Sequence, residues 1–433
     1  MRISTIQAFN NGVQGLQRNY ANVTRTQEQI STGNRILTPA DDPVASVRLL
    51  QLEQQQNVLS QYGSNLTAAK NSLTQEEVTL NSVNTILQRV RELTVQAGNG
   101  ALSQTDRRSI AAELGTREEE LLGLMNTRNA RGEYLFAGLQ GKTQPFVRQA
   151  DGTYSYQGDE GQRKLQVASS LELPISDNGK KTFENVINAG RLSLNDSSVP
   201  PAPLPTGPVS GLLVDDEVSF ASFPANGFQL DFDAVDPMNY TLRPVTTPGI
   251  PGAPPAPDTP AVLGTAISGR LKQGEDTLVH YQGVAFYVNG TPAAGASFTI
   301  TGPDASPATP PPNKVGILST IASLRNALEN ATDSPAGSRE TRDAVALALT
   351  NLDHGMATVD GVRGEIGARL NVVESTQIDN EDVSLVNKAV QTDLRELDYP
   401  EALSRLTFQS IVLEAAQQSY VKISGLNLFD KLR

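Results

Sequence analysis

The sequence predicts a mainly α fold with an inserted β-rich region, built as a long antiparallel coiled-coil helical bundle with an outer β domain. Apolar residues recur at spacings of three and four over long stretches at both ends of the chain. Between Val199 and Asn313 lie 20 of the 26 prolines, and a coiled coil does not accommodate them. Helical patterns resume after that segment, so the simplest closure folds the C-terminal helices back along the N-terminal ones.

The first helix is expected from about Ser4 to Gln29, because its apolar residues form one narrow stripe. Ser31 to Asn34 ends this helix, and Gly33 is suited to a positive φ angle. A narrow stripe of medium-sized side chains is typical of a helix that meets other helices. The stripe, the N-terminal seam, comprises Ile6, Phe9, Val13, Leu16, Tyr20, Val23, Gln27 and Ile30.

A short polar elbow follows. Asp42 is a natural N-cap and Pro43 a natural first helical residue. We expect the elbow to fix the angle between the first two helices or to pair with a neighbouring molecule, and a solvated capped turn is the alternative. The elbow residues are Asn34, Arg35, Pro39, Asp41, Asp42 and Pro43.

Two further helices are predicted before the β-rich region. The second runs from Pro43 to Ala97, a length of about 80 Å at about 1.5 Å per residue, which indicates a rod. The third begins at Gln104, is capped by Ser103 with Asp106 three residues later, and is expected to continue to about Phe136.

The middle of the chain reads as strands and extended loops. Residues 153–156 and 164–167 are predicted to form one hairpin, and residues 286–288 and 298–300 another. Phe228 to Phe232 alternates apolar and polar residues, as a half-buried strand does. Residues 200–208 and 251–260 are predicted to be proline-rich spacers.

Helix is expected to return near Val315, and Ser338 is predicted to cap a second rod. The apolar pattern slips between Val383 and Val390, and Pro400 is expected to open the last helix. That helix carries the C-terminal seam, which comprises Ala402, Leu406, Gln409, Leu413, Ala416, Tyr420, Ile423 and Asn427.

These patterns divide the chain into six parts. Residues 1–40 are the N-terminal assembly helix and elbow, 41–146 the N-terminal rod helices, 147–198 a β-hairpin region of the rod, 199–313 a variable outer β domain, 314–399 the C-terminal rod helices, and 400–433 the C-terminal assembly helix.

The two terminal helices are the candidate functional site. A lone helix of this kind buries too little apolar surface to offset the entropy of ordering its backbone. We therefore hypothesise that both ends are largely disordered in the monomer and fold when neighbouring copies assemble. The alternative is that both stripes belong to ordinary amphipathic helices of one globular bundle.

Composition argues against several other classes of protein. The net charge of −12 disfavours non-specific nucleic-acid binding, and the absence of Cys excludes disulfides and thiolate chemistry. No apolar run is long enough for a transmembrane helix, and the first residues do not form a cleavable signal peptide.

Catalytic and ligand sites are not predicted. Residues 141–143 read Gly-Lys-Thr, but the preceding glycine of a phosphate-binding loop is replaced by Phe136. His280 and His354 lack a second metal ligand at a suitable spacing, and residues 231–236 carry only part of a calcium-loop pattern. We expect no enzyme activity, no cofactor and no metal. An enzyme with a pocket in the β insertion is the third-ranked alternative.

Several separate motifs resemble the bacterial flagellin family. Residues 30–36 read ISTGNRI and residues 39–43 read PADDP, which is similar to the signature after the first helix of that family. The hook-associated protein 3 branch is resembled by three further segments: residues 1–5 (MRIST), residues 131–138 (RGEYLFAG) followed by Pro145 and Phe146, and residues 418–432. The resemblance covers about the first 146 and the last 100 residues.

This resemblance implies a structural adaptor at the hook–filament junction. Its implied partners are other copies of itself, a neighbouring hook-associated protein, flagellin, and an export chaperone on the C-terminal helix. Nucleic acid and membrane are not implied. The implied location is extracellular, on the flagellum, after export without a cleaved signal. The alternatives are flagellin itself, or a secreted coiled-coil adhesin or effector.

Overall fold

The computed structural model describes residues 2–196, 208–245, 266–303 and 311–429. It divides into two compact units. The first comprises residues 1–67, 166–171 and 373–433, and the second comprises residues 68–165 and 172–372. The proline-rich segments 200–207 and 251–260 lie outside the described residues. Within the described part of the chain, no helix is both long enough and apolar enough to cross a bilayer.

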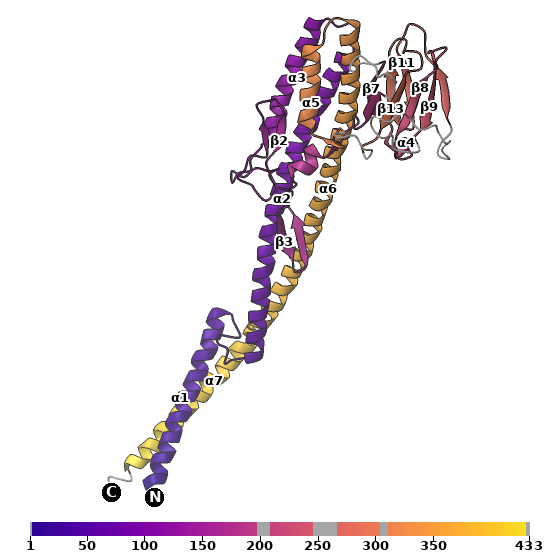
Figure 1. Ribbon diagram of the computed structural model, residues 1–433. Helices are drawn as coiled ribbons and strands as arrows, with labels where there is room; N and C mark the ends of the chain where they lie inside the picture. The colour runs from indigo at the N-terminus through magenta and orange to yellow at the C-terminus, as the bar shows by residue number, and fades with distance from the viewer. Residues whose placement is uncertain (1, 197–207, 246–265, 304–310, 430–433) are drawn as a thin grey trace. The chain divides into compact units, whose positions relative to one another are not determined.

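In the first unit, helices α1 (Arg2–Thr32) and α7 (Tyr399–Phe429) lie side by side and antiparallel, so the start of α1 lies beside the end of α7 (Figure 1). The same unit holds the beginning of α2 (Pro43–Ala97) and the end of α6 (Pro335–Arg395). The amide of Gln56 donates to the hydroxyl of Ser384 at 2.7 Å, which places these parts of α2 and α6 against each other.

The second unit contains a helical bundle formed by the rest of α2 and α6 with α3 (Gln104–Met125) and α5 (Ile317–Asn330). Its interior is aliphatic, because each helix turns one stripe inward. The fully buried members of that interior include Leu73, Leu80, Leu87, Leu114, Leu121, Ile321, Leu328, Val359 and Ile366.

Two helix predictions are confirmed and one is wrong. The long helix spans Pro43 to Ala97 as expected, and Ser103 and Asp106 form a reciprocal capping box at the start of α3. However, α3 ends at Met125, eleven residues before Phe136. Beyond it the chain turns at Gly132, which has a φ of +79°, and buries the apolar residues 134–137 as an irregular segment.

Other helix boundaries also differ from expectation. Helix α6 begins at Pro335, and the hydroxyl of Ser334 accepts from the amide of Gly337 at 3.1 Å, so Ser334 caps this helix and the prediction of Ser338 is wrong. Helix α5 begins at Ile317, directly after a short strand, β14 (Lys314–Val315). The slip in the apolar pattern between 383 and 390 does not interrupt α6.

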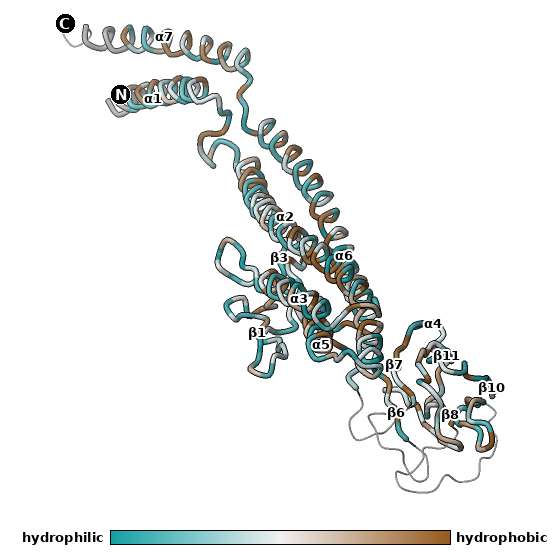
Figure 2. The backbone as a smooth tube through the Cα atoms, turned by 90° about the horizontal axis from the view of Figure 1, so that it is seen from above, coloured by the Kyte–Doolittle hydropathy of each residue, from teal (hydrophilic) through white to brown (hydrophobic). Residues whose placement is uncertain are grey.

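Eight strands of the second unit form two antiparallel sheets that enclose one apolar core. One sheet has the order β10-β9-β8-β13-β6 and the other β11-β12-β7 (Figure 1). Figure 2 shows the hydrophobic segments of these strands within this domain. The strands are β6 (Ser193–Asp196), β7 (Val209–Val214), β8 (Phe228–Phe232), β9 (Asn239–Pro244), β10 (Ile267–Arg270), β11 (Thr277–Tyr281), β12 (Val284–Val288) and β13 (Ser297–Thr301).

Of these strand predictions, one is confirmed and two are wrong. The alternation over Phe228 to Phe232 is confirmed, since the three apolar residues are buried and the two polar ones half-buried. The hairpin between residues 286–288 and 298–300 is wrong, because β12 and β13 belong to different sheets of the sandwich. The hairpin between residues 153–156 and 164–167 is also wrong, because β2 (Tyr154–Tyr156) pairs with β1 (Phe146–Arg148).

The β sandwich is fastened to α6 by Arg342. Its guanidinium lies 3.6 Å from the centre of the Tyr287 ring and donates to Asp276 at 2.8 Å and to Asn289 at 3.1 Å. Asp276 also pairs with Arg339 on the preceding turn of α6. Further short elements are β3 (Lys164–Ala168), β4 (Leu171–Pro174), η1 (Lys180–Glu184), β5 (Val186–Ile187) and α4 (Glu217–Phe220).

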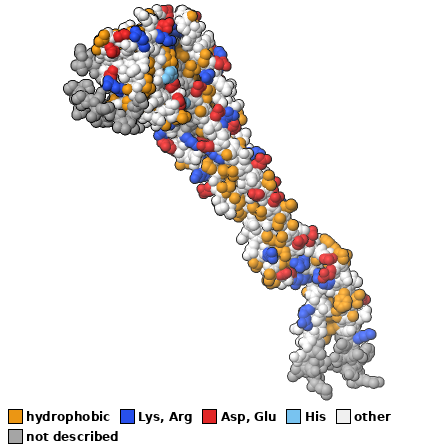
Figure 3. Space-filling model, turned by 90° about the vertical axis from the view of Figure 1, so that its right-hand side faces the viewer, with side chains coloured by type: hydrophobic (Ala, Val, Ile, Leu, Met, Phe, Trp, Pro, Cys, Tyr) orange, Lys and Arg blue, Asp and Glu red, His pale blue; other side chains and the backbone are white. Residues whose placement is uncertain are grey.

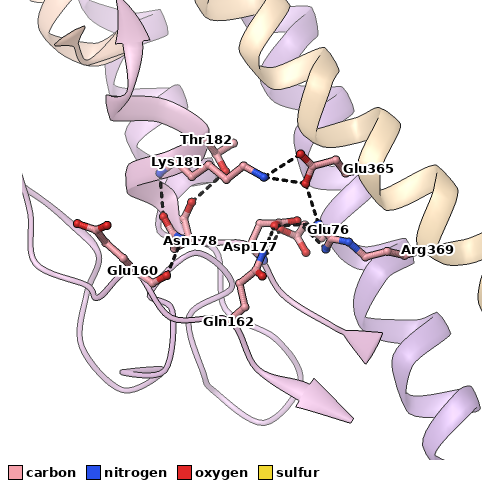
Figure 4. A network of polar contacts seen from close by, with 9 residues as sticks. All are labelled: Glu76, Glu160, Gln162, Asp177, Asn178, Lys181, Thr182, Glu365 and Arg369. Atoms are coloured by element: carbon pink, nitrogen blue, oxygen red, sulfur yellow. Dashed lines mark hydrogen bonds and ion pairs between the residues drawn. The ribbon is translucent and has the colours of Figure 1, made fainter. Parts of the chain in front are cut away.

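A buried polar network holds the segment before η1 between α2 and α6 (Figure 4). The carboxylate of Asp177 has no exposed surface and accepts from Arg369 at 2.8 and 3.0 Å and from Gln162 at 2.7 Å. Burial, together with the neighbouring Asp177 carboxylate, raises the pKa of Glu76 well above its usual value. The network fixes this segment because breaking it would leave a buried charge without a partner.

Candidate functional site: the paired terminal helices

The two predicted seams face each other, but they are only partly covered. On α1, the side chains of Val13, Leu16, Val23 and Ile30 are half-buried. On α7, Ala402 is fully buried, and Leu406, Gln409, Leu413, Ala416 and Tyr420 are half-buried. Phe9 and Tyr20 remain 50% and 65% exposed. The side chains of Ile6, Ile423 and Asn427 lie outside the described residues.

One aromatic contact joins the two helices near the chain ends. The rings of Phe9 and Tyr420 lie with their centroids 5.3 Å apart. Gly12, one turn after Phe9, lies below the same tyrosine, and a Cβ atom there would come within 3.4 Å of the ring. The small residue therefore lets Tyr420 lie close to α1.

Toward the elbow the seam becomes polar. Thr26 and Gln29 are 3% and 9% exposed, and Thr26 donates to the Gln409 side chain at 2.8 Å. Arg405 donates to the Gln29 side chain at 3.1 Å. Gln27, which the sequence pattern places in the seam, is exposed instead. These hydrogen bonds set the register of α1 on α7, because each requires one partner at one position.

The elbow is organised by its two aspartates. Asp41 accepts from the amides of Leu37 and Thr38 at 2.8 and 2.9 Å and forms an ion pair with Arg25. Asp42 accepts from the amide of Ala45 at 2.9 Å and so caps α2, with Pro43 as its first residue. Pro39 and Pro43 are both exposed.

The elbow is also hydrogen-bonded to the turn between α6 and α7. The amide of Arg35 donates to the carbonyl of Arg395 at 2.8 Å, and the amide of Leu397 donates to the carbonyl of Gly33 at 3.1 Å. Asn34 forms an isolated antiparallel bridge with Glu396. Gly33 has a φ of +72°, and a Cβ atom there would lie 3.0 Å from the hydroxyl of Tyr399.

The partner turn at residues 394–399 is the functional segment that sequence reasoning missed. Its only signal was Pro400, which marks a helix start but does not reveal a partner 360 residues earlier. A polar pocket of about 420 Å³ lies between α1, the elbow and α7, and its lining includes Arg25, Arg35, Asp41, Asp42 and Arg405. The elbow and the turn at residues 394–399 form one joint, because backbone hydrogen bonds connect them.

The residues considered for catalysis or metal binding have local partners. The Nδ1 atom of His354 lies 3.0 Å from the carbonyl of Ile187, and His280 lies 3.0 Å from Asp215. Asp233 accepts from the amides of Val235 and Asp236 and so stabilises a turn. Among the described residues no group of three or more His, Asp or Glu side chains gathers as a metal site.

Comparison with known proteins relates this chain to flagellar proteins. Residues 3–141 match the family model described as the bacterial flagellin N-terminal helical region. Flagellar hook-associated protein 3 of Escherichia coli (strain K12) is 35% identical over 186 residues, which cover 43% of this chain and 58% of that protein. The flagellar filament 41 kDa core protein of Borreliella burgdorferi is 38% identical over 112 residues, covering 26% of this chain and 32% of that protein.

A solved structure extends the likeness to most of the fold. The crystal structure of flagellar hook-associated protein 3 from Legionella pneumophila matches with a TM-score of 0.62 at 26% identity, covering 79% of this chain and 98% of that chain. The predicted fold class is confirmed, and so is the resemblance to hook-associated protein 3. The chain spans less than two thirds of the curated relatives that it matches.

Proposed function

We propose that this chain is a structural adaptor of the bacterial flagellum that joins the hook, through another hook-associated protein, to the flagellin filament. The observation that carries the proposal is the incomplete burial of the paired terminal helices. Their common seam is half-covered, and Phe9, Tyr20 and several residues of α7 remain largely exposed. The likeness to hook-associated protein 3 in sequence and in fold supports the same role.

The mechanism is assembly by helix packing. The exposed parts of both seams bury apolar surface when α1 and α7 meet the same helices of neighbouring subunits. Head-to-tail contacts of this kind propagate until a different partner ends them. The joint made by the elbow and the turn at residues 394–399 holds α1 and α7 together during assembly. Its backbone hydrogen bonds run both from the elbow to the turn and from the turn to the elbow.

The partners of this adaptor are other copies of the chain, a neighbouring hook-associated protein and flagellin. A chaperone covers the C-terminal helix before export, which protects its apolar residues from non-specific association. The adaptor acts outside the cell, on the flagellum. It has no catalytic role, since assembly requires surfaces rather than a reaction.

A filament subunit is the second candidate, and the comparisons favour the adaptor. The match to hook-associated protein 3 extends over 186 residues, while the match to the filament core protein extends over 112. Three sequence segments, residues 1–5, 134–138 and 428–432, also resemble the hook-associated branch rather than flagellin.

Deletion of residues 406–433 tests the mechanism. The truncated chain should be produced but should fail to join hook to filament, so that flagellin accumulates in the medium. An immunoblot of cells and medium with an antibody against the β domain separates failed assembly from failed production or export. If the truncated chain is exported and still supports attached filaments, assembly through α7 is wrong.

A further inference from the structure

Gln29 is a buried polar residue at the point where α1, the elbow and α7 meet. It lies in the last turn of α1 and is only 9% exposed. Its side chain lines the polar pocket together with Arg35 of the elbow and Arg405 of α7. Burying an amide costs free energy unless it is hydrogen-bonded, whereas an aliphatic side chain gains from burial. The use of an amide at this position therefore depends on its hydrogen bonds.

Both ends of the Gln29 amide are bonded. Its NH2 group donates to the backbone carbonyl of Arg35 at 2.6 Å, and its oxygen accepts from the guanidinium of Arg405 at 3.1 Å. The amide cannot be reversed, because its oxygen would then face a carbonyl and its NH2 group would face a guanidinium. Glutamate lacks the donor, lysine lacks the acceptor and methionine lacks both. Glutamine meets the two requirements with one group.

The elbow end of this connection continues into the turn at residues 394–399. The backbone amide of Arg35 donates to the carbonyl of Arg395 at 2.8 Å. The guanidinium of Arg35 donates to the carbonyl of Leu394 at 3.2 Å. Arg35 therefore bonds the turn through its amide and its side chain, and bonds Gln29 through its carbonyl.

Together these contacts form a closed ring. The hydrogen bonds run from the turn through the elbow and Gln29 to Arg405, and α7 itself leads from Arg405 back to the turn. Each bond holds the groups of the next one in place, so the bonds of such a network strengthen one another. Figure 3 shows acidic and basic side chains mixed in the lower part of the view, so surface charge alone does not single out this ring.

We propose that Gln29 couples the joint to the pairing of α1 with α7, so that neither forms fully without the other. The inference rests on the proposed function, because it explains how the two assembly helices reach their neighbours as one aligned pair. Gln29 is a positioning residue, since it acts through Arg35 and Arg405 rather than by contact with a neighbouring subunit. A change on the elbow side of the amide must then be felt in α7, and a change on the α7 side must be felt in the joint.

Thiol labelling in isolated flagella tests this coupling. The natural chain has no cysteine, so a maleimide-linked polymer shifts on a gel only chains with an introduced one. Leu397→Cys reports on the joint, since Leu397 lies in the turn and is 8% exposed. Leu413→Cys reports on the pairing of α1 with α7, because Leu413 is half-buried in the seam. Immunoblotting with an antibody against the β domain measures the labelled fraction of this chain alone.

Two variants each remove one side of the connection. Gln29→Glu keeps an acceptor for Arg405 but places a carboxylate oxygen against the carbonyl of Arg35. Arg405→Met removes only the bond from α7. Gln29→Glu should speed labelling at position 413, and Arg405→Met should speed labelling at position 397, each about fivefold, the effect of losing one hydrogen bond. Effects confined to position 397 for the first variant and to position 413 for the second would overturn the coupling.

Gln29→Met separates hydrogen bonding from packing. Methionine has a similar volume but neither donor nor acceptor, so the variant should speed labelling at both positions. The amount of this chain in isolated flagella should fall about fivefold. Arg405→Lys keeps a cationic donor and should behave like the natural chain. Labelling and incorporation of the Gln29→Met chain equal to those of the natural chain would overturn the proposal.

Two control variants make these outcomes specific. Gln27→Met makes the same substitution two residues earlier on α1, where the side chain is exposed, and Lys422→Met removes a different exposed cation from α7. Both should be incorporated normally, and equal losses in Gln27→Met and Gln29→Met would contradict the assignment. If the natural chain is absent from the hook–filament junction, the proposed function fails. If it is present and Gln29→Met behaves like the natural chain, only the coupling fails.

Discussion

Phe9 and Tyr420 pack with their ring centroids 5.3 Å apart and their planes tilted by 46°, although 410 residues separate them in sequence. The contact joins the first part of α1 to the last part of α7. Both rings also keep exposed surface, since Phe9 is 50% exposed and Tyr420 is half-buried. The pair is therefore aligned within one chain, and both rings keep surface that a further contact can bury.

The free monomer should show weak amide protection along the terminal helices. Leu16 and Leu413 lie in the middle of the seams, yet both remain half-buried in the single chain. Hydrogen exchange should give protection at these positions far below that at fully buried Leu80 and Leu114, and protection should rise on assembly. Protection at Leu16 equal to that at Leu80 in the monomer would contradict folding on assembly.

Arg369→Met should destabilise the second unit strongly. Asp177 is fully buried, and removal of its guanidinium partner leaves a buried carboxylate at a cost of about 3–5 kcal/mol. Arg117→Met is the matched control, because its partners Glu113 and Glu120 are exposed and such pairs contribute about 0–1 kcal/mol. Chemical unfolding of both variants measures the difference. Similar losses in the two would show that the Asp177 network does not hold this region.

Stability should depend on the ionisation of Glu184. Burial raises its pKa to about 7 in the fold, from a usual value of 4.5. Because the folded pKa is the higher one, the stabilising contribution of the protonated group is present below pH 4.5 and is lost as the pH rises through 7. Glutamine at position 184 cannot ionise. The melting temperature of the Glu184→Gln variant should therefore rise relative to that of the natural chain as the pH increases from about 5 to about 8. An unchanged difference across this range would contradict the assignment.

Two glycines of the β domain provide a matched pair. Gly227 and Gly274 have φ angles of +79° and +80°, so alanine at either costs about 1–2 kcal/mol in backbone strain. At Gly227 a Cβ atom would also lie 2.1 Å from the carbonyl oxygen of Ile300, whereas the space at Gly274 is open. Thermal unfolding should therefore show a much larger loss for Gly227→Ala than for Gly274→Ala. Equal losses of stability would mean that strand β8 shifts to accommodate the added methyl group at no cost in free energy.

Local signals in the sequence were enough to predict the long helices. Pro43 with Asp42 marks the start of α2, and Gly98 follows its end, so the bounds of that helix follow from caps and periodicity. The end of α3 was not predictable in this way, because residues 134–137 are apolar and read as a continuing stripe. Instead, residues 134–137 are themselves part of an irregular segment that follows the turn at Gly132, and their side chains are buried there.

Long-range pairing was the part that the sequence did not reveal. The strands β12 and β13 are close in sequence, and the loop between them, residues 289–296, begins with Asn289 and Gly290, which favours a hairpin. The sandwich places them in different sheets, since each buries its apolar face against other strands. Likewise the elbow residues were identified from local polarity, but their partner turn at residues 394–399 required the tertiary structure.

Immunogold labelling of intact flagella, with an antibody raised against residues 209–301, tests the adaptor role most directly. An adaptor predicts label confined to one narrow zone where the filament meets the hook. Label distributed along the filament, or absent from the flagellum altogether, would contradict it.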